Sequence, residues 1–364
     1  MIVEKKRLKL KLNFTTQNGF VLKNPEVAYE EYGENNMEVI LITHGGLSSM
    51  HAAGIYQDNH NENGWWDEII GPNKVFDTNK YRIICANALG SMYGTCSPIT
   101  TNHETGNIYG NSFPTITFVD QVKFFKQFLD ELGIDKLYLA AGVSMGSMHN
   151  LQLAALYPDF VGGVISVATA GRMPPSGIAI HNFISNTLKL DAAYNNGNYK
   201  KGTHFNNLIV IHQMAKIYYT HERVIKSLCW DSVQDGPKSQ EQRVNNINQY
   251  LEAGIEQRIK NEDPNCIIRI LHAINTYNLG LGFDKYETGV QKIKCPVLLV
   301  NINTDQEFPP HWAQEVADII NDKNPSQAEV KILDSPWGHI GCLKETDEFK
   351  KIFPVFMKKI EKIL

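Results

Sequence analysis

The feature that most constrains this chain is the alternation of short apolar runs with helical patterns along its first 170 residues. Apolar side chains recur at helical spacing between residues 117 and 132, and a second helical segment ends near Tyr157. Strands that alternate with helices at this pitch form a parallel sheet with helices on both faces. The sequence therefore predicts an α/β fold, with strands over residues 39–43, 81–86, 136–141 and 163–168 and a first strand over 8–14.

The rhythm changes after residue 171, where the pattern becomes mainly helical and richer in Asn, Gln, His and Tyr. Strand patterns resume at 294–300 and 328–333, and an amphipathic helix closes the chain. We therefore expect one sheet domain, built from residues 1–171 and 293–364, that carries a helical insertion over residues 172–292.

Composition excludes several classes of protein. The 364 residues are 43% hydrophobic and 20% charged, which is typical of a soluble globular protein. The net charge of -4 offers no basic excess for a nucleic-acid partner, and no apolar run is long enough to span a membrane. Six scattered cysteines without a CxxC pair favour a reducing cytoplasm and argue against structural zinc. His44, His51 and His60 lack metal-binding spacing, so we expect hydrogen-bonded histidines and no metal site.

The segment most informative about chemistry is Gly142-Val-Ser-Met-Gly146, which is the only GxSxG in the chain. It follows a predicted strand directly and opens into a predicted helix. A nucleophilic serine on such a sharp turn has a strained backbone, and small flanking residues let the neighbouring chains pass. The alternative is a glycine-rich turn with an incidental serine, but the strand-to-helix context favours Ser144 as a nucleophile.

A serine hydroxyl needs a base, and the base needs a carboxylate that fixes its tautomer. In α/β hydrolases the order along the chain is serine, acid, histidine. Asp305 and His339 each follow a predicted strand in that order, at the sheet edge where crevices open. Glu307 and Asp334 are competing acids, but strand position and chain order together favour Asp305.

Two backbone N–H groups are candidates for stabilising an oxyanion. Met145 opens the helix behind the serine, and Gly46 lies in the His44-Gly-Gly-Leu47 loop after the strand at 39–43. That loop could equally be a plain tight turn. We expect Gly46 and Met145 to form the oxyanion hole.

The chain resembles the homoserine O-acetyltransferase family of the α/β-hydrolase superfamily over nearly its whole length. Several of the shared motifs are long and rich in Trp, Pro and Gly, which makes the resemblance far more specific than GxSxG alone. They are Ala28-Tyr-Glu-Glu-Tyr-Gly33, His51-Ala-Ala-Gly54, Gly64-Trp-Trp-Asp67, Ile70-Gly-Pro72, Ala86-Asn-Ala-Leu-Gly90, Tyr93-Gly94, Phe113-Pro-Thr-Ile-Thr117, Gly142-Val-Ser-Met-Gly146, Leu156-Tyr-Pro158, Ala168-Thr-Ala170, Asp305-Gln-Glu-Phe-Pro-Pro310 and Asp334-Ser-Pro-Trp-Gly-His339.

The resemblance implies an α/β-hydrolase fold with an eight-stranded, mostly parallel sheet and an inserted helical lid. The family's serine, aspartate and histidine match Ser144, Asp305 and His339. The family's chemistry is ping-pong transfer from acetyl-CoA, a co-substrate rather than a bound cofactor, to an amino-acid hydroxyl. The resemblance also implies a role in methionine biosynthesis, small-molecule substrates and a homodimer formed through the lid.

Two departures from the family pattern concern the acceptor. Members of the family that use homoserine usually carry an arginine on a lid helix. The matching position here is His212, in the same predicted helical segment as Tyr219. The family's catalytic histidine is usually followed by an aspartate that contacts the acceptor, and Ile340 stands there instead. Histidine is a poorer carboxylate ligand than arginine, and isoleucine cannot accept a hydrogen bond. We expect His212, Tyr219 and Ile340 to line the acceptor site, and homoserine stays open as the acceptor.

Lys216 or Arg223 could supply the missing positive charge from a neighbouring turn. The first hypothesis is therefore an O-acyltransferase with a small hydroxylated acceptor. The second is an esterase or thioesterase that uses the same residues with water as acceptor. The third is a non-catalytic binding protein of this fold, which the complete Ser/Asp/His set disfavours.

Overall fold

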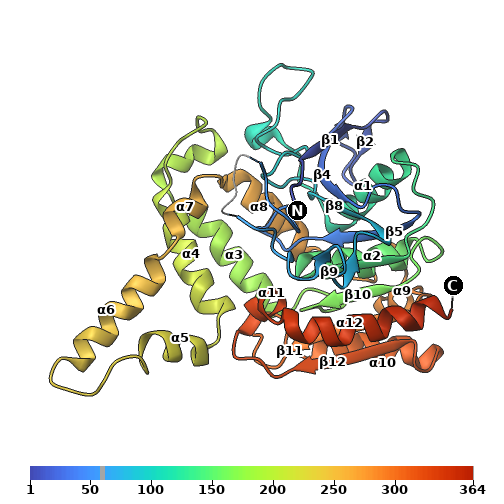
Figure 1. The fold of residues 1–364 in the computed structure, drawn as a ribbon. Helices are drawn as coiled ribbons and strands as arrows, with labels where there is room; N and C mark the ends of the chain where they lie inside the picture. Colours follow the sequence, from blue (N-terminus) through green and yellow to red (C-terminus); the bar gives the residue numbers. More distant parts are fainter. Residues whose placement is uncertain (58–61, 364) are drawn as a thin grey trace.

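A computed structural model describes residues 1–57 and 62–363, and an eight-stranded sheet forms its centre (Figure 1). The two pairings that involve β4 are antiparallel, and every other pairing in this sheet is parallel. The predicted α/β fold with a mostly parallel sheet is thereby confirmed. In spatial order the strands are β1 (Lys6–Lys9), β4 (Glu26–Tyr32), β8 (Tyr81–Ala86), β5 (Glu38–Thr43), β9 (Leu139–Val143), β10 (Val164–Val167), β11 (Val297–Ile302) and β12 (Ala328–Leu333).

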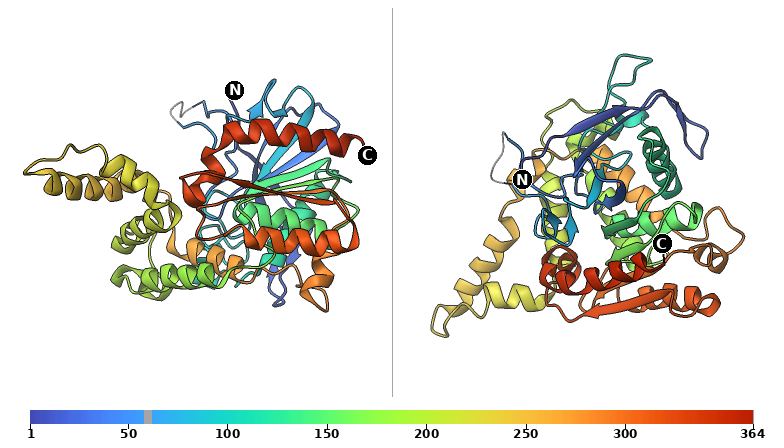
Figure 2. Two further views of the ribbon diagram at one scale, coloured as in Figure 1. Left: turned by 90° about the horizontal axis from the view of Figure 1, so that it is seen from below. Right: turned by 45° about the vertical axis from the view of Figure 1, so that its right-hand side comes forward.

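The middle strands are buried on both faces. Every residue of β9, β10 and β11 is buried, which explains why these strands are continuous apolar runs rather than alternating ones. In Figure 2 (left), the red C-terminal helix α12 (Thr346–Glu361) lies on one side of the sheet and the orange-red α10 (His311–Lys323) on the other. Helix α1 (Phe118–Glu131) begins at a capping box formed by Thr117 and Asp120, and packs beside α2 (Met145–Leu156).

An aromatic cluster holds α12 in place. Phe349 and Phe353 stack one turn apart on its buried side, and both meet the ring of Trp66. Phe76 completes the cluster by packing against Phe353. It belongs to β7 (Phe76–Asp77), a short strand that pairs with β6 (Ile70–Gly71). The four side chains are fully buried, so the C-terminal helix is joined to the first third of the chain by apolar area. A second two-stranded sheet pairs β2 (Phe14–Thr15) with β3 (Val21–Leu22).

The segment between β10 and β11 is helical, as the sequence pattern indicates, but its parts differ in burial. Helix α8 carries nine buried residues and packs against α1, whereas α6 carries none. Figure 1 shows α5 and α6 extending away from the sheet as an arm. The helices of this insertion are α3 (Pro175–Lys189), α4 (Asn206–Tyr219), α5 (Glu222–Cys229), α6 (Ser239–Glu252), α7 (Ile255–Ile259), α8 (Pro264–Asn275) and α9 (Tyr286–Val290).

Some element boundaries differ from the prediction. The first strand occupies residues 6–9 rather than 8–14, and β9 runs on through Val143 to the residue before Ser144. Strand β4 was not predicted, because the acidic residues Glu30 and Glu31 interrupt its apolar pattern. All six cysteines are free and buried. Within residues 1–57 and 62–363, no helix is both long and apolar enough to cross a membrane.

Candidate active site

Ser144 stands at a strained turn between β9 and α2. Its φ of 53° and ψ of -124° lie in a region that residues with a side chain rarely adopt, and its N–H donates to Val167 O at 2.9 Å. The flanking glycines are required by close packing. A Cβ on Gly142 would lie 2.1 Å from Thr43 Oγ1, and one on Gly146 would lie 2.1 Å from Thr43 O. This turn lifts the serine hydroxyl out of the sheet at the carboxyl ends of the strands.

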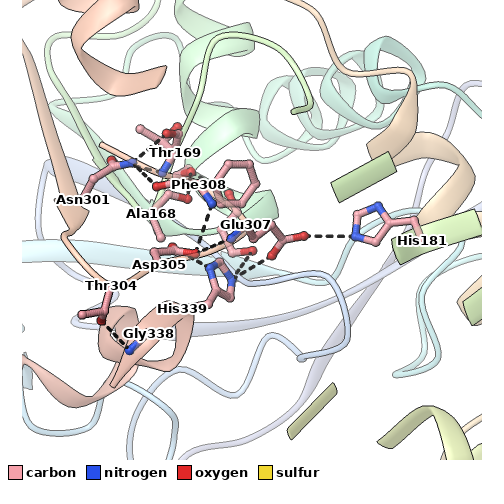
Figure 3. Close-up of polar contacts among 12 residues, drawn as sticks. Ala168, Thr169, His181, Asn301, Thr304, Asp305, Glu307, Phe308, Gly338 and His339 are labelled. Carbon is pink, nitrogen blue, oxygen red and sulfur yellow. Dashed lines mark hydrogen bonds and ion pairs between the residues drawn. The ribbon is translucent and has the colours of Figure 1, made fainter. Parts of the chain in front are cut away.

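The structure brings the three residues predicted for catalysis together (Figure 3 shows two of them). His339 Nε2 lies 3.0 Å from Ser144 Oγ, and His339 Nδ1 lies 2.9 Å from Asp305 Oδ2. The other carboxylate oxygen of Asp305 accepts the backbone N–H groups of Glu307 and Phe308 at 2.8 and 3.1 Å. The two backbone donors therefore orient the carboxylate so that Oδ2 faces the imidazole.

Side chains next to these residues join the loops that carry them. Thr304 Oγ1 accepts the N–H of Gly338 and donates to Ser335 O, so the loop after β11 is tied to the loop after β12 (Figure 3). Asn301 similarly bridges Thr169 O and Phe308 O from the end of β11. These bonds hold the acid and the base in register although 34 residues separate them in sequence.

The two competing acids, Asp334 and Glu307, occupy different positions relative to His339. Asp334 is exposed, accepts a hydrogen bond from Asn303 and pairs with Arg223 at 3.6 Å, away from the imidazole. Glu307 is buried and does reach His339, but at Nε2 rather than Nδ1, with its Oε2 at 3.4 Å. Asp305 is thus the acid that faces Nδ1, and Glu307 is an additional carboxylate in the site.

The two carboxylates strongly affect His339. Burial lowers the pKa of its imidazole, but the negative charges of Asp305 and Glu307 outweigh burial and raise that pKa to about 9. A histidine in this environment binds a proton readily, and the two carboxylates stabilise the imidazolium that forms when it takes a proton from a hydroxyl.

The loop after β5 lies over the serine. A Cβ on Gly45 would contact Ser144 Cβ at 3.7 Å, and both Gly45 and Gly46 line the cavity in front of it. His44 holds the loop by accepting the N–H of Ala88 at Nε2, and burial lowers the pKa of its imidazole to about 4. Met145 is the first residue of α2, a position whose N–H has no partner within the helix. Gly46 and Met145, the two residues predicted to donate to an oxyanion, thus both line the cavity next to Ser144.

A cavity of about 380 Å³ opens in front of Ser144, a volume suited to a small molecule. The three residues expected at the acceptor site, His212, Tyr219 and Ile340, all line it. The ring of Tyr219 lies 5.2 Å from that of His339. The insertion and the sheet domain approach each other closely here. A Cβ added to Gly338 of the sheet domain would lie only 2.9 Å from Tyr219 O of the insertion. The cavity is therefore enclosed partly by the insertion.

One positive charge in the cavity comes from a residue that the sequence analysis did not name, Arg258, whereas Arg223 is not among the residues that line the cavity. His212 Nε2 contacts the buried carboxylate of Glu262, which also pairs with Arg258 at 3.2 Å. Arg258 lines the cavity and reaches Leu47 O in the loop over the serine at 3.4 Å. Lys216 also lines the cavity, but its ammonium donates to Tyr250 O and Ala253 O.

Sequence reasoning missed the place of three residues in the site. Arg258 and His181 come from α7 and α3 of the insertion, and Glu307 was seen only as a rival to Asp305. No local pattern links these positions, because tertiary packing alone brings them together. His44 and His51 are buried and hydrogen-bonded, while His60 lies outside the described residues. Within the described part of the chain, no group of three His, Cys, Asp or Glu side chains is arranged to hold a metal ion.

Comparisons with known proteins agree with this architecture. The family model for the α/β-hydrolase fold matches residues 38–346. A homoserine O-acetyltransferase of Deferribacter desulfuricans is 33% identical over 99% of this chain and 96% of its own length.

Solved structures point the same way. The crystal structure of a homoserine O-acetyltransferase from Bacillus anthracis superposes with a TM-score of 0.89 at 26% identity, covering 98% of each chain. Esterase E22 superposes with a TM-score of 0.86 at 29% identity, covering 98% of this chain and 100% of the esterase. These relatives therefore match nearly the full length of this chain. On these grounds the chain belongs to the homoserine O-acetyltransferase family of the α/β-hydrolase superfamily.

Proposed function

We propose that this protein is a serine-nucleophile O-acetyltransferase that moves an acetyl group from acetyl-CoA, through acetyl-Ser144, to a small hydroxylated acceptor. The observation that carries the proposal is the continuous contact from Ser144 Oγ to His339 Nε2 and from Nδ1 to Asp305, at the base of a cavity bordered by the lid. The chain's membership of the family supports the choice of acetyl transfer.

In the first half-reaction, Ser144 Oγ attacks the thioester carbonyl while His339 Nε2 takes the hydroxyl proton. Asp305 stabilises the imidazolium that forms, and the N–H groups of Gly46 and Met145 face the developing oxyanion. The tetrahedral intermediate then expels the coenzyme A thiolate, which leaves as the thiol after taking the proton from His339. The product is acetyl-Ser144.

In the second half-reaction, the acceptor hydroxyl attacks acetyl-Ser144 and gives its proton to His339. Collapse of the new intermediate breaks the bond to Ser144 Oγ, which recovers its proton from the imidazolium. The product is an O-acetyl ester, and the site is restored. Water in place of the acceptor would give acetate by the same steps.

The acceptor site combines an anion ligand with apolar surface. Arg258 is a permanent planar cation on the cavity wall. Its Nε pairs with Glu262 and its Nη2 reaches Leu47 O, but its other guanidinium N–H groups suit a carboxylate-bearing acceptor such as homoserine. Such an acceptor would assign the enzyme to methionine biosynthesis. His212 is less suited to this task because Glu262 already occupies its Nε2.

A hydrolase is the second candidate, and a specific observation favours it. Ile340 lines the cavity directly beside His339, where family members that use homoserine carry an aspartate. An apolar side chain there offers no hydrogen bond to an acceptor, which leaves water as the competing nucleophile. The likeness to esterase E22 supports the same alternative.

One assay separates the two candidates. The protein is mixed with acetyl-CoA, and free thiol release is followed alone and with homoserine, serine or other hydroxylated compounds. A transferase releases thiol many times faster when its acceptor is present and forms the O-acetyl product. Equal release with and without every acceptor would instead support hydrolysis.

We further propose that two copies associate through the lid. Helices α4, α5 and α6, with the residue that follows α5, expose apolar side chains at 38 to 55% of their area, and α5 and α6 extend from the body (Figure 1). These residues are Val210, Ile217, Leu228, Trp230 and Val244. Burying them in a second copy would remove apolar area from water. Light scattering after gel filtration should give twice the chain mass, and a monomer at micromolar concentration would contradict the proposal.

A further inference from the structure

Glu307 is a buried carboxylate with an unusual set of neighbours. Its Oε1 lies 3.1 Å from His181 Nε2, and its Oε2 lies 3.4 Å from His339 Nε2 (Figure 3). The residue is 3% exposed, and no lysine or arginine of the described chain lies within ion-pair distance of it. A buried carboxylate is stable only when other groups compensate its charge, so these two imidazoles must do so.

The contacts of His181 show where a proton is held. His181 Nδ1 lies 2.8 Å from Asn275 Oδ1, and the amide nitrogen of Asn275 faces Asn182 Oδ1 at 3.3 Å. Nδ1 must therefore donate, while Nε2 faces the carboxylate of Glu307. The group that faces Glu307 Oε1 is therefore an imidazole whose ring is oriented by its hydrogen bond to Asn275.

The contact of Glu307 with His339 is on the catalytic side of the ring. Asp305 already occupies Nδ1, so a neutral His339 presents a lone pair at Nε2, toward Ser144 and toward Glu307 Oε2. A carboxylate oxygen facing a lone pair is repelled, whereas the same oxygen facing an N–H is attracted. Glu307 therefore favours the protonated form of His339, and it does so at Nε2, the nitrogen that receives the proton of Ser144.

The other groups around this carboxylate do not compensate its charge. Tyr218 and Tyr219 approach from α4 and Cys342 from α11 (Gly341–Lys344). For each of these groups burial, together with the carboxylates, raises the pKa above its usual value, so each stays neutral near neutral pH. Ser144 is neutral as well. The charge balance at His339 thus depends on Asp305, Glu307 and His181.

We propose that Glu307, oriented by His181, is a positioning residue that tunes His339 by supplying a second carboxylate at its Nε2 side. The proposal rests on the proposed function, in which His339 is the general base. Glu307 makes the base stronger and stabilises the imidazolium in both half-reactions. The same effect has a cost: at neutral pH a larger fraction of the free enzyme has His339 already protonated, and protonated His339 cannot act as a base.

This trade-off predicts crossing pH profiles. In Glu307→Gln, the isosteric amide can still bond His181, but the negative charge at Nε2 is gone, so the pKa that controls kcat/KM should fall by about one unit. The neutral, active fraction at pH 7 should then rise up to about tenfold, while the plateau at alkaline pH should be lower because the base is weaker. His181→Asn removes the imidazole that faces Glu307 Oε1, which leaves His339 as the only imidazole in contact with this carboxylate, and should move the controlling pKa upward.

The experiment follows kcat/KM for p-nitrophenyl acetate from about pH 6 to about pH 10 for the wild type, Glu307→Gln and His181→Asn. Opposite displacements of the two variants support the proposal, because general loosening of the site would move both in one direction and lower both profiles. Profiles that shift together, or that superpose on the wild type, would overturn it.

A second measurement does not need turnover. The imidazole nitrogens of His339 are titrated by NMR in the Ser144→Ala background, with and without Glu307→Gln, and the His339 signal is identified by its loss in His339→Gln. The proposal predicts a lower pKa for His339 when Glu307 is replaced, and an unchanged titration would contradict it. Failure of the proposed function would appear separately, as a wild-type protein that is never acylated.

Discussion

Asp305→Asn should reduce catalysis severely while leaving the fold intact. In the wild type, Asp305 Oδ1 accepts two backbone N–H groups, from Glu307 and Phe308, and Oδ2 accepts the Nδ1–H of His339. The amide oxygen of an asparagine can satisfy the two backbone donors, but its NH₂ group then faces Nδ1. That arrangement holds His339 in the tautomer with its proton on Nε2, which cannot accept the proton of Ser144.

The magnitude follows from the cost of reversing the amide. Turning the NH₂ group toward Glu307 and Phe308 would leave two buried N–H groups unpaired, at about 1–3 kcal/mol each, or about 2–6 kcal/mol in total. Lost stabilisation of the imidazolium adds to this cost. We therefore expect kcat/KM to fall by about 10³–10⁴, which corresponds to about 4–5.5 kcal/mol.

The assay is the rate of acylation by p-nitrophenyl acetate, measured together with the thermal unfolding midpoint. Asp334→Asn is the matched control, because Asp334 sits at the mouth of the same loops with its side chain 81% exposed and does not contact His339. It should keep wild-type activity. If Asp305→Asn kept more than a tenth of the wild-type rate, the reasoning would be refuted, and Glu307 would become the candidate for the orienting acid.

Two further substitutions test the turn and the cavity. Gly146→Ala would place a Cβ 2.1 Å from Thr43 O and should lower the free energy of unfolding by about 1–3 kcal/mol or more. The control is Gly236→Ala, which has open space around the added Cβ and should change the free energy of unfolding little. Urea unfolding measures both variants. Arg258→Met should raise KM for homoserine about tenfold to hundredfold relative to an uncharged alcohol acceptor, since it removes a charged hydrogen-bond donor. Arg223→Met, outside the cavity, should leave that ratio unchanged, and equal effects of the two substitutions would contradict the assignment.

Much of the fold could be predicted because the buried strands carry a simple signal. Strands β8 and β12 match their predicted ranges. Strand β8 is a mostly buried apolar run, and β12 alternates apolar and charged residues over its first five positions. Strand β4 escaped prediction because it carries Glu30, whose buried carboxylate is satisfied by Tyr32, Tyr56 and His51. Such a network depends on residues far apart in sequence, so no local pattern reveals it.

Some residues of the candidate site could be predicted from local sequence patterns, and others could not. Ser144, Asp305 and His339 could be found because each follows a strand, and the ends of parallel strands meet at one edge of the sheet. The sequence also indicated the correct acid, although it could not show that Glu307 reaches the opposite nitrogen of the imidazole. His181 and Arg258 lie on insertion helices whose placement is set by packing, and their contacts became visible only in three dimensions.

The central claim is that Ser144 carries the acyl group between donor and acceptor. Intact-mass measurement after brief mixing with acetyl-CoA, followed by peptide mapping, tests this claim most directly. The account predicts one acetyl group per chain, located on the peptide that contains Ser144, absent in Ser144→Ala and discharged when the acceptor is added. An acetyl group on another residue, or the same labelling and turnover in Ser144→Ala, would contradict it.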